Sequence, residues 1–294
     1  MTFEGKAGIG EQLSYDSLRI QFRRAGSGPA LVLVHGLLGY SFSWRGVIPT
    51  LARDYEVFAL DMPGAGFSDC RADLECRLVS AANRLLGFLD AAGVQSCHLV
   101  GSSYGGATAA LVSGLAPGRV RSLTLVSPAN PWSRIGRKRL TLLRNRAVAF
   151  AFPKVARAAR PLHKYFVRRM WGDKTRITQE TLEGYSLPLV RPGVFEHAVR
   201  IVRTWREDMA ELERTFSRIS AIPVLLVWGS KDRVVDPESA KELQRALPAS
   251  EFAVIEGAGH LPYEERPEEF CQILQDFLRN QASLAIARTA REVT

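Results

Sequence analysis

The stretch CHLVGSSYGGATAALVSGLA, residues 97–116, decides the fold class of this 294-residue chain. Its first residues form a short apolar run that ends in glycine and two serines, and the remainder is made largely of small and apolar residues. An apolar run that passes through a glycine-rich turn into a helical pattern is typical of a strand and the following helix of an α/β protein. The turn would then lie at the carboxyl end of a strand, where such proteins bind their ligands.

Ser103 is the residue of this turn that we expect to act as a nucleophile. A serine on a sharp strand-to-helix turn needs very small residues two positions before it and two positions after it, the G-x-S-x-G pattern. Gly101 and Gly105 meet that requirement for Ser103, whereas Ser102 would have valine and tyrosine in those places. The alternative is that one of the serines only caps the helix by accepting a backbone hydrogen bond.

Apolar runs of similar length recur along the chain and alternate with helix-like segments. Continuous runs of Val, Leu and Ala are typical of parallel strands that are buried on both faces. Such runs cover residues 29–36, 55–61, 97–103, 120–128, 223–232 and 251–259. Residues 17–26 alternate polar and apolar side chains, which indicates an antiparallel edge strand. Helical patterns lie near residues 75–92, 104–116, 238–247 and 267–280. The sequence therefore predicts an α/β fold with a doubly wound, mostly parallel sheet.

The alternation of strands and helices stops between residues 129 and 221. No buried strand is evident there, and prolines interrupt the helical patterns. Within residues 154–170 one helical face holds the apolar residues Val155, Ala158, Ala159, Leu162, Phe166 and Met170. Pro161 is expected to kink or divide that helix. We therefore predict a core domain made of residues 1–128 and 222–294, with residues 129–221 inserted as a helical cap.

A serine nucleophile needs a base beside it and an acid that orients the base. His260 directly follows the last predicted strand, so we expect it at the same edge of the sheet as Ser103. Asp232 stands just past the end of the preceding strand, whereas Asp236, next to a proline, better suits a loop or a helix cap. The sequence therefore predicts a catalytic triad of Ser103, Asp232 and His260.

The other histidines have different expected places. His98 lies within the strand before the nucleophile, which predicts packing in the core. His163 and His197 fall in the inserted segment, where we expect surface positions. His35 opens the loop after an early strand, and we expect it to hold that loop by hydrogen bonds.

The loop that follows this early strand is expected to complete the site. Gly36 permits a sharp turn that aims a backbone N–H inward, and an oxyanion needs two such donors. We assign the N–H groups of Leu37 and Tyr104 as the oxyanion hole. The residues expected to line the substrate pocket are Leu38, Trp132, Phe152 and Leu261.

Five motifs together resemble a known family. They are HGLLG (35–39), DMPGAGFSD (61–69), GSSYGG (101–106), WGSKD (228–232) and GAGHLPYEERPEEF (257–270). In this order and spacing the chain resembles the α/β-hydrolase family with a helical cap, over residues 15–128 and 222–280. The resemblance implies the same triad and a cap at the insertion. Ser102 departs from the pattern, because many relatives carry histidine before the nucleophile.

Within that family the residues favour ester hydrolysis through an acyl-enzyme on a small to medium, fairly hydrophobic ester. Dehalogenases and epoxide hydrolases of this kind use an aspartate where Ser103 stands, and carbon–carbon bond hydrolases usually place Trp where Leu261 stands. Proline-type aminopeptidases typically carry an HGGPG loop in place of HGLLG. The alternatives kept open are a carbon–carbon bond hydrolase, an acyltransferase, a perhydrolase and a ligand receptor with little turnover.

The composition is that of a soluble globular protein, with 46% hydrophobic and 23% charged residues. The chain begins without the basic and apolar regions of a signal peptide, and it has no apolar run long enough to span a bilayer. The four cysteines show no metal-binding spacing. We expect a cytoplasmic protein with reduced thiols, no metal and no cofactor.

The net charge of +9 is concentrated in one segment. Residues 129–176 hold fourteen Lys or Arg residues and one acidic residue, Asp173. These basic residues can form solvated outer faces of cap helices, or they can contact an anionic membrane or an anionic substrate. No nucleic-acid-binding fold is recognisable, so we expect no nucleic acid partner. The oligomeric state is left open.

Overall fold

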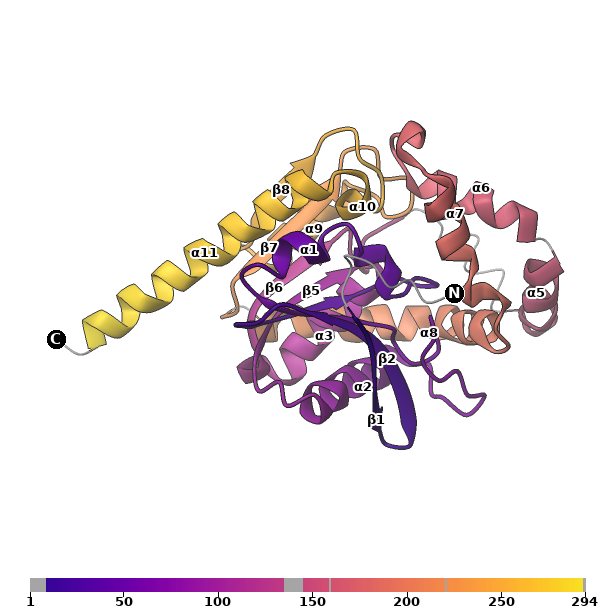
Figure 1. Ribbon diagram of the computed structural model, residues 1–294, viewed down its shortest axis with the longest axis horizontal. Helices are drawn as coiled ribbons and strands as arrows, with labels where there is room; N and C mark the ends of the chain where they lie inside the picture. Colours follow the sequence, from indigo (N-terminus) through magenta and orange to yellow (C-terminus); the bar gives the residue numbers. More distant parts are fainter. Residues whose placement is uncertain (1–8, 135–144, 159, 220, 293–294) are drawn as a thin grey trace.

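The computed structural model describes residues 9–134, 145–158, 160–219 and 221–292. An eight-stranded sheet forms the centre of the molecule, with the strand order β1-β2-β4-β3-β5-β6-β7-β8 (Figure 1). β1 and β2 pair with their neighbours in antiparallel orientation, and the other strands are parallel. The strands are β1 (Ile9–Tyr15), β2 (Leu18–Ala25), β3 (Ala30–Val34), β4 (Glu56–Leu60), β5 (Cys97–Ser102), β6 (Val120–Val126), β7 (Val224–Gly229) and β8 (Glu251–Ile255).

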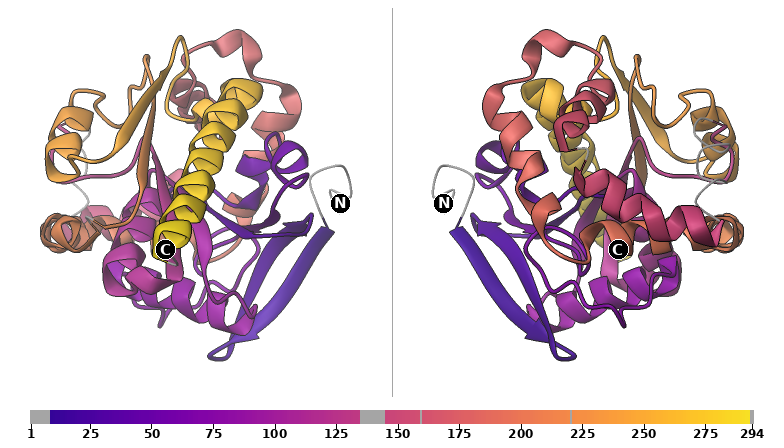
Figure 2. Two further views of the ribbon diagram at one scale, coloured as in Figure 1. Left: turned by 90° about the vertical axis from the view of Figure 1, so that its left-hand side faces the viewer. Right: turned by 90° about the vertical axis from the view of Figure 1, so that its right-hand side faces the viewer.

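Helices cover both faces of the twisted sheet (Figure 2). The core helices are α1 (Ile48–Leu51), α2 (Leu78–Ala91), α3 (Tyr104–Leu115), α9 (Ser239–Ala246), α10 (Pro262–Glu265) and α11 (Pro267–Glu292). α2, α3 and α9 contribute to the apolar cluster on one face, and α1, α10 and α11 to that on the other. Side chains alternate along each strand between the two faces, so Val32 joins the first cluster and Leu31 the second. This arrangement confirms the predicted fold class.

Helices fill the connection between β6 and β7. They are α5 (Arg146–Ala158), α6 (Arg160–Met170), α7 (Gln179–Ser186) and α8 (Val194–Thr215). Short 3₁₀ helices occur at η1 (Ser41–Trp44), η2 (Pro117–Arg119), η3 (Lys174–Arg176), η4 (Pro188–Val190) and η5 (Phe216–Ile219). Within its described residues this connection contains no strand. The boundaries predicted at residues 129 and 221 lie between β6 and β7, and the division into two domains stays a prediction.

Two details of the predicted sheet differ from the structure. Residues 17–26 do form an antiparallel strand, β2, but the prediction that it lies at the edge is wrong because β1 pairs along its outer side. α11 continues beyond residue 280 and its end projects away from the body of the molecule (Figure 1). Within the described residues no helix is long and apolar enough to cross a membrane.

Candidate active site

Ser103 occupies a strained turn between β5 and α3. Its backbone angles are φ 53° and ψ −120°, which residues other than glycine rarely adopt. Hydrogen bonds hold this conformation: its N–H donates to the Val126 carbonyl at 3.0 Å, and its carbonyl accepts from the Ala129 N–H at 2.9 Å. The strain turns the side chain out of the sheet, so Ser103 is only half-buried and lines a cavity.

The glycines around Ser103 are required by close backbone contacts. A Cβ at Gly101 would lie 2.3 Å from the Gly105 carbonyl oxygen, and a Cβ at Gly105 would lie 2.3 Å from the carbonyl oxygen of His35. Ser102, by contrast, is completely buried. Its Oγ makes no hydrogen bond of normal geometry within the described residues. The two neighbouring serines therefore have opposite environments.

His260 and Asp232 form a buried pair at the carboxyl ends of the last two strands. His260 Nδ1 lies 2.9 Å from Asp232 Oδ2, and both residues are less than 7% exposed. The other carboxylate oxygen of Asp232 accepts the N–H groups of Val234 and Val235, at 2.7 and 3.1 Å. These bonds fix the carboxylate, so it can hold the imidazole in one orientation. His260 lines the same cavity as Ser103.

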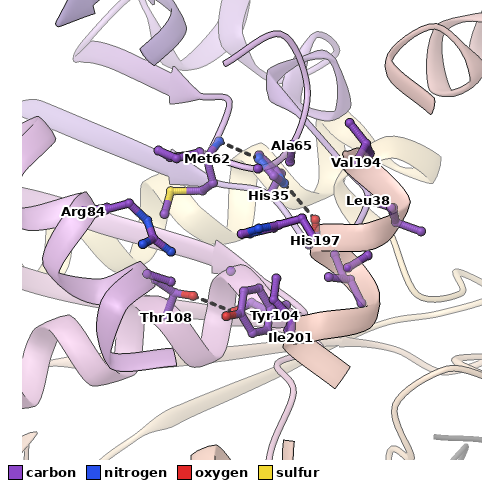
Figure 3. Close-up of a pocket in the computed structure, with 17 residues that line it drawn as sticks. His35, Leu38, Met62, Ala65, Arg84, Tyr104, Thr108, Val194, His197 and Ile201 are labelled. Carbon is purple, nitrogen blue, oxygen red and sulfur yellow. Dashed lines mark hydrogen bonds between the residues drawn. The ribbon is translucent and has the colours of Figure 1, made fainter. Parts of the chain in front are cut away.

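The loop after β3 lies directly against Ser103. A Cβ at Gly36 would stand 3.0 Å from the Ser103 Cβ. His35 Nε2 accepts the Met62 N–H at 2.9 Å, and its Nδ1 lies 2.8 Å from the Gly36 carbonyl (Figure 3). Because Nε2 is the acceptor, Nδ1 carries the proton and donates it to that carbonyl. Burial lowers the pKa of His35, which favours this neutral form. His35 thus holds the loop that contains Leu37.

The cavity beside Ser103 has a volume of about 440 Å³ and a mostly apolar wall. Leu37, Leu38, Phe152 and Leu261 line it. α6 adds further apolar side chains that were not predicted to line the pocket, namely Phe166, Val167 and Met170. Tyr104, expected to contribute its N–H, is the first residue of α3 and follows Ser103 directly.

Three expected positions differ from those observed. Trp132 is not among the described residues that line the cavity: its ring stacks on Phe216 at 5.5 Å, and the Asn130 side chain accepts its backbone N–H at 3.0 Å. His197 is buried rather than on the surface, because α8 packs it against Gly64 and 3.4 Å from the Cys76 thiol. His163 is half-buried on the cavity wall. Helical patterning alone did not reveal which face of the insertion packs inward.

Glu265 is a buried carboxylate that was not among the predicted site residues. It accepts the N–H groups of Gly259, Gly172 and Asp173, at distances between 2.6 and 3.1 Å. It therefore ties the residue before His260 to the chain just after α6. A glutamate five residues after the predicted base was visible in the sequence, but its partners are backbone groups distant along the chain.

Comparisons with known proteins agree with this architecture. The family model described as "alpha/beta hydrolase fold" matches residues 29–267. "Uncharacterized hydrolase YugF" of Bacillus subtilis is 30% identical over 253 residues, covering 85% of this chain and 89% of that protein. "2-hydroxy-6-oxo-6-phenylhexa-2,4-dienoate hydrolase" of Comamonas testosteroni is 27% identical over 269 residues, covering 89% and 92%.

Among solved structures, a bacterial virulence factor described as a membrane phospholipase A is similar to this chain. It has a TM-score of 0.77 and 26% identity, covering 94% of this chain and 87% of that one. The names of these relatives and the family match support hydrolase activity. The chain belongs to the α/β hydrolase fold family.

Proposed function

We propose that this protein is a serine hydrolase that cleaves carboxylic esters through an acyl-enzyme. The observation that carries the proposal is that Ser103, on its strained turn, lines the same cavity as the buried His260–Asp232 pair. A hydroxyl, a base and a fixed carboxylate are the groups that nucleophilic acyl transfer requires.

In the proposed reaction Ser103 Oγ attacks the acyl carbonyl while His260 accepts its proton. The N–H groups of Leu37 and Tyr104 stabilise the oxyanion that forms. The His260 imidazolium, oriented by Asp232, then protonates the leaving alcohol. Water attacks the acyl-enzyme with the same base, and Ser103 regains its proton.

The cavity wall favours a neutral, hydrophobic ester. Its described lining contains no Asp, Glu, Lys or Arg side chain. Burial lowers the pKa of His163 on the wall, so this histidine is neutral at pH 7. Apolar surface stabilises an acyl or alcohol chain in proportion to the area removed from water, whereas a charged substrate would lose its hydration without gaining a charged partner.

A carbon–carbon bond hydrolase is the second candidate, supported by the 27% identity to the Comamonas testosteroni dienoate hydrolase. Its named substrate is a carboxylate, and the absence of a cation in the described lining makes it the weaker candidate. Acyl transfer, perhydrolysis and a receptor with little turnover would use the same cavity.

Fluorophosphonate labelling tests the nucleophile, because the reagent modifies an activated serine covalently. We expect the wild type and Ser102→Ala to be labelled and Ser103→Ala not to be. Labelling that persists in Ser103→Ala, or that disappears only in Ser102→Ala, would contradict the assignment.

A p-nitrophenyl ester series of increasing chain length then tests the substrate class. We expect turnover to rise from acetate toward medium chains and to vanish in Ser103→Ala. Labelling without turnover of any ester would favour the receptor, and turnover of a dienoate but of no ester would favour the carbon–carbon bond hydrolase.

A further inference from the structure

The helices α5 and α6 expose large apolar side chains. Six of them are at least 40% exposed: Val148, Phe150, Phe152, Val155, Tyr165 and Phe166. The four large apolar side chains of the described residues that are more than half exposed all lie in this segment. Scattered apolar residues on a surface are ordinary, but a concentration of this kind marks an interaction site.

These apolar side chains face two ways. Phe152 and Val155 of α5 and Phe166 of α6 line the cavity that contains Ser103. Phe150 and Tyr165 are not among its lining residues, and they are 73% and 61% exposed. α5 and α6 therefore carry apolar side chains both on the cavity wall and outside it, and the Tyr165 and Phe166 rings, whose centres lie 5.9 Å apart, connect the two sets. Both helices lie at the margin of the molecule, on the side opposite the end of α11 (Figures 1 and 2).

Exposed basic residues lie on the same two helices as the outward aromatic rings. Lys154, Lys164, Arg168 and Arg169 are exposed, and none of them pairs with a carboxylate within the described residues. Lys154 Nζ lies 4.7 Å from the centre of the Phe150 ring. Residues 145–170 contain no acidic residue. The outward face, defined here by Phe150, Lys154, Tyr165, Arg168 and Arg169, thus combines aromatic rings with unpaired positive charge.

We propose that this outward face docks on a lipid bilayer that carries anionic headgroups. Aromatic rings favour the boundary between headgroups and acyl chains. Basic side chains on the same helices are attracted by the negative surface potential, which strengthens binding about fivefold for each charge. An anionic substrate does not explain the charge, because the described cavity wall contains no cation.

Docking would bring the cavity mouth to the membrane surface, since Phe152, Val155 and Phe166 belong to the docking helices. A lipid acyl ester could then pass from the bilayer along apolar side chains toward Ser103. This consequence rests on the proposed function, whereas docking itself does not. The substrate class that follows is an ester of a membrane lipid.

Vesicle flotation with the full chain carrying Ser103→Ala measures docking without hydrolysis. Vesicles of phosphatidylcholine are compared with vesicles containing about one-third phosphatidylglycerol, at about 0.1 M and about 1 M salt, where screening lengths differ about threefold. We expect binding to the anionic vesicles at low salt and much weaker binding at high salt. Equal recovery with neutral and anionic vesicles, or recovery with neither, would overturn the proposal.

Variants locate the binding face. Changing Lys154, Arg168 and Arg169 together to Glu should weaken binding at least 100-fold, since three attractions are lost. Phe150→Ser with Tyr165→Ser should weaken it at least tenfold. None of these residues lines the cavity, so hydrolysis of a short, monomeric p-nitrophenyl ester should stay unchanged while hydrolysis of a vesicle lipid falls.

The matched control changes an aromatic and a basic residue outside α5 and α6. Phe252 on β8 is 40% exposed and Lys241 on α9 is also exposed. Phe252→Ser combined with Lys241→Glu should leave vesicle binding unchanged. If this variant lost as much vesicle binding as the α5 and α6 variants, the effect would not be specific to the outward face. Retention on double-stranded DNA without binding to vesicles would identify a different anionic partner and overturn the proposal. If the fluorophosphonate failed to label Ser103 in the wild type while vesicle binding stayed intact, the proposed function would be rejected and membrane docking would not.

Discussion

Ser102 and Ser103 differ in environment because one residue ends a strand and the next begins a turn. Ser102 belongs to β5 and points into the packed interior, where its hydroxyl has the buried Tyr263 hydroxyl as a polar neighbour. Ser103 adopts a positive φ and lines the cavity. The lack of space for side chains at two glycine positions, rather than serine chemistry, therefore favours Ser103 over Ser102 as the proposed nucleophile.

Asp232→Asn should lower the activity by removing the carboxylate that orients His260. In Asp232→Asn the amide keeps the shape of the carboxylate but can donate a hydrogen bond, so it stabilises the wrong tautomer of His260 and cannot stabilise the imidazolium. We expect kcat on a p-nitrophenyl ester to fall roughly 10⁴-fold. Circular dichroism should show an unchanged fold.

Asp236→Asn is the matched control. Asp236 is the other aspartate of this loop, and its carboxylate accepts the Glu238 N–H at 3.1 Å, which is a local turn contact. Its activity should stay within about twofold of the wild type, because a local contact of this kind affects stability by about 1 kcal/mol. A comparable loss of activity in both variants would reject Asp232 as the orienting acid.

At the scale of elements, α6 is tied to the loop that contains His260. The His260 N–H donates to the Met170 carbonyl at 2.7 Å, at the end of α6. The Glu265 carboxylate also accepts the N–H groups of Gly259 and Gly172. The helix that forms part of the cavity wall and the loop that carries the proposed base are thus held as one unit. A change at this junction should therefore alter the position of His260 and lower the proposed activity.

Glu265→Gln tests that connection. An amide offers one acceptor oxygen where the carboxylate offers two, and its NH₂ group would face backbone donors. We expect the free energy of unfolding to fall by about 1–3 kcal/mol. We also expect kcat to fall by roughly tenfold to a hundredfold, because small displacements of a reacting group are costly. Both quantities are measured at a temperature where the variant is fully folded.

Glu268→Gln is the control for this position, since Glu268 is exposed in the first turn of α11. It should leave kcat unchanged. If Glu265→Gln lowered only stability, with kcat and the fluorophosphonate labelling rate intact, Glu265 would have a structural role and no positioning role.

Across the whole molecule, the core could be predicted from sequence and much of the insertion could not. The buried strands β3 to β7 are continuous apolar runs, and the residues predicted for chemistry follow their ends. β1 was missed because its sequence, IGEQLSY, lacks such a run, and only its pairing with β2 defines it.

The insertion was harder to predict because some of its apolar residues pack in the protein interior and others line the cavity or face outward. Val155 and Phe166 were assigned to one apolar helical face, and both are more than half exposed at the cavity. Val167, which was not assigned to that face, is 1% exposed. Helical periodicity does not distinguish a face that packs on protein from one that lines a binding cavity. Trp132, which lies in a turn, and His197, on α8, were placed only by their position in the insertion, and that position does not determine how a side chain packs.

Two buried histidines in different elements should contribute to the stability of the protein against acid. Burial lowers the pKa of His98 to about 4, and it does the same for His197, with help from the positive charges of Arg84 and Arg200. Both residues lie less than 10% exposed and far apart in sequence, one in β5 and one in α8. Each is neutral in the native state, whereas in the unfolded chain each titrates near pH 6.5.

Because the histidine pKa is lower in the native state than in the unfolded chain, acid should lower the free energy of unfolding. Below about pH 6.5 the unfolded chain binds protons that the native state does not, so the free energy of unfolding falls as the pH drops toward 4. Each histidine contributes up to about 1.4 kcal/mol per pH unit within that window. Urea unfolding between pH 7.5 and 5, above the range of most carboxyl groups, measures this slope. His197→Gln and His98→Gln should each reduce it, and the double variant should reduce it further. The remaining slope belongs to His35 and His163, whose pKa burial also lowers. A slope that is unchanged in the double variant would show that other groups carry the acid sensitivity.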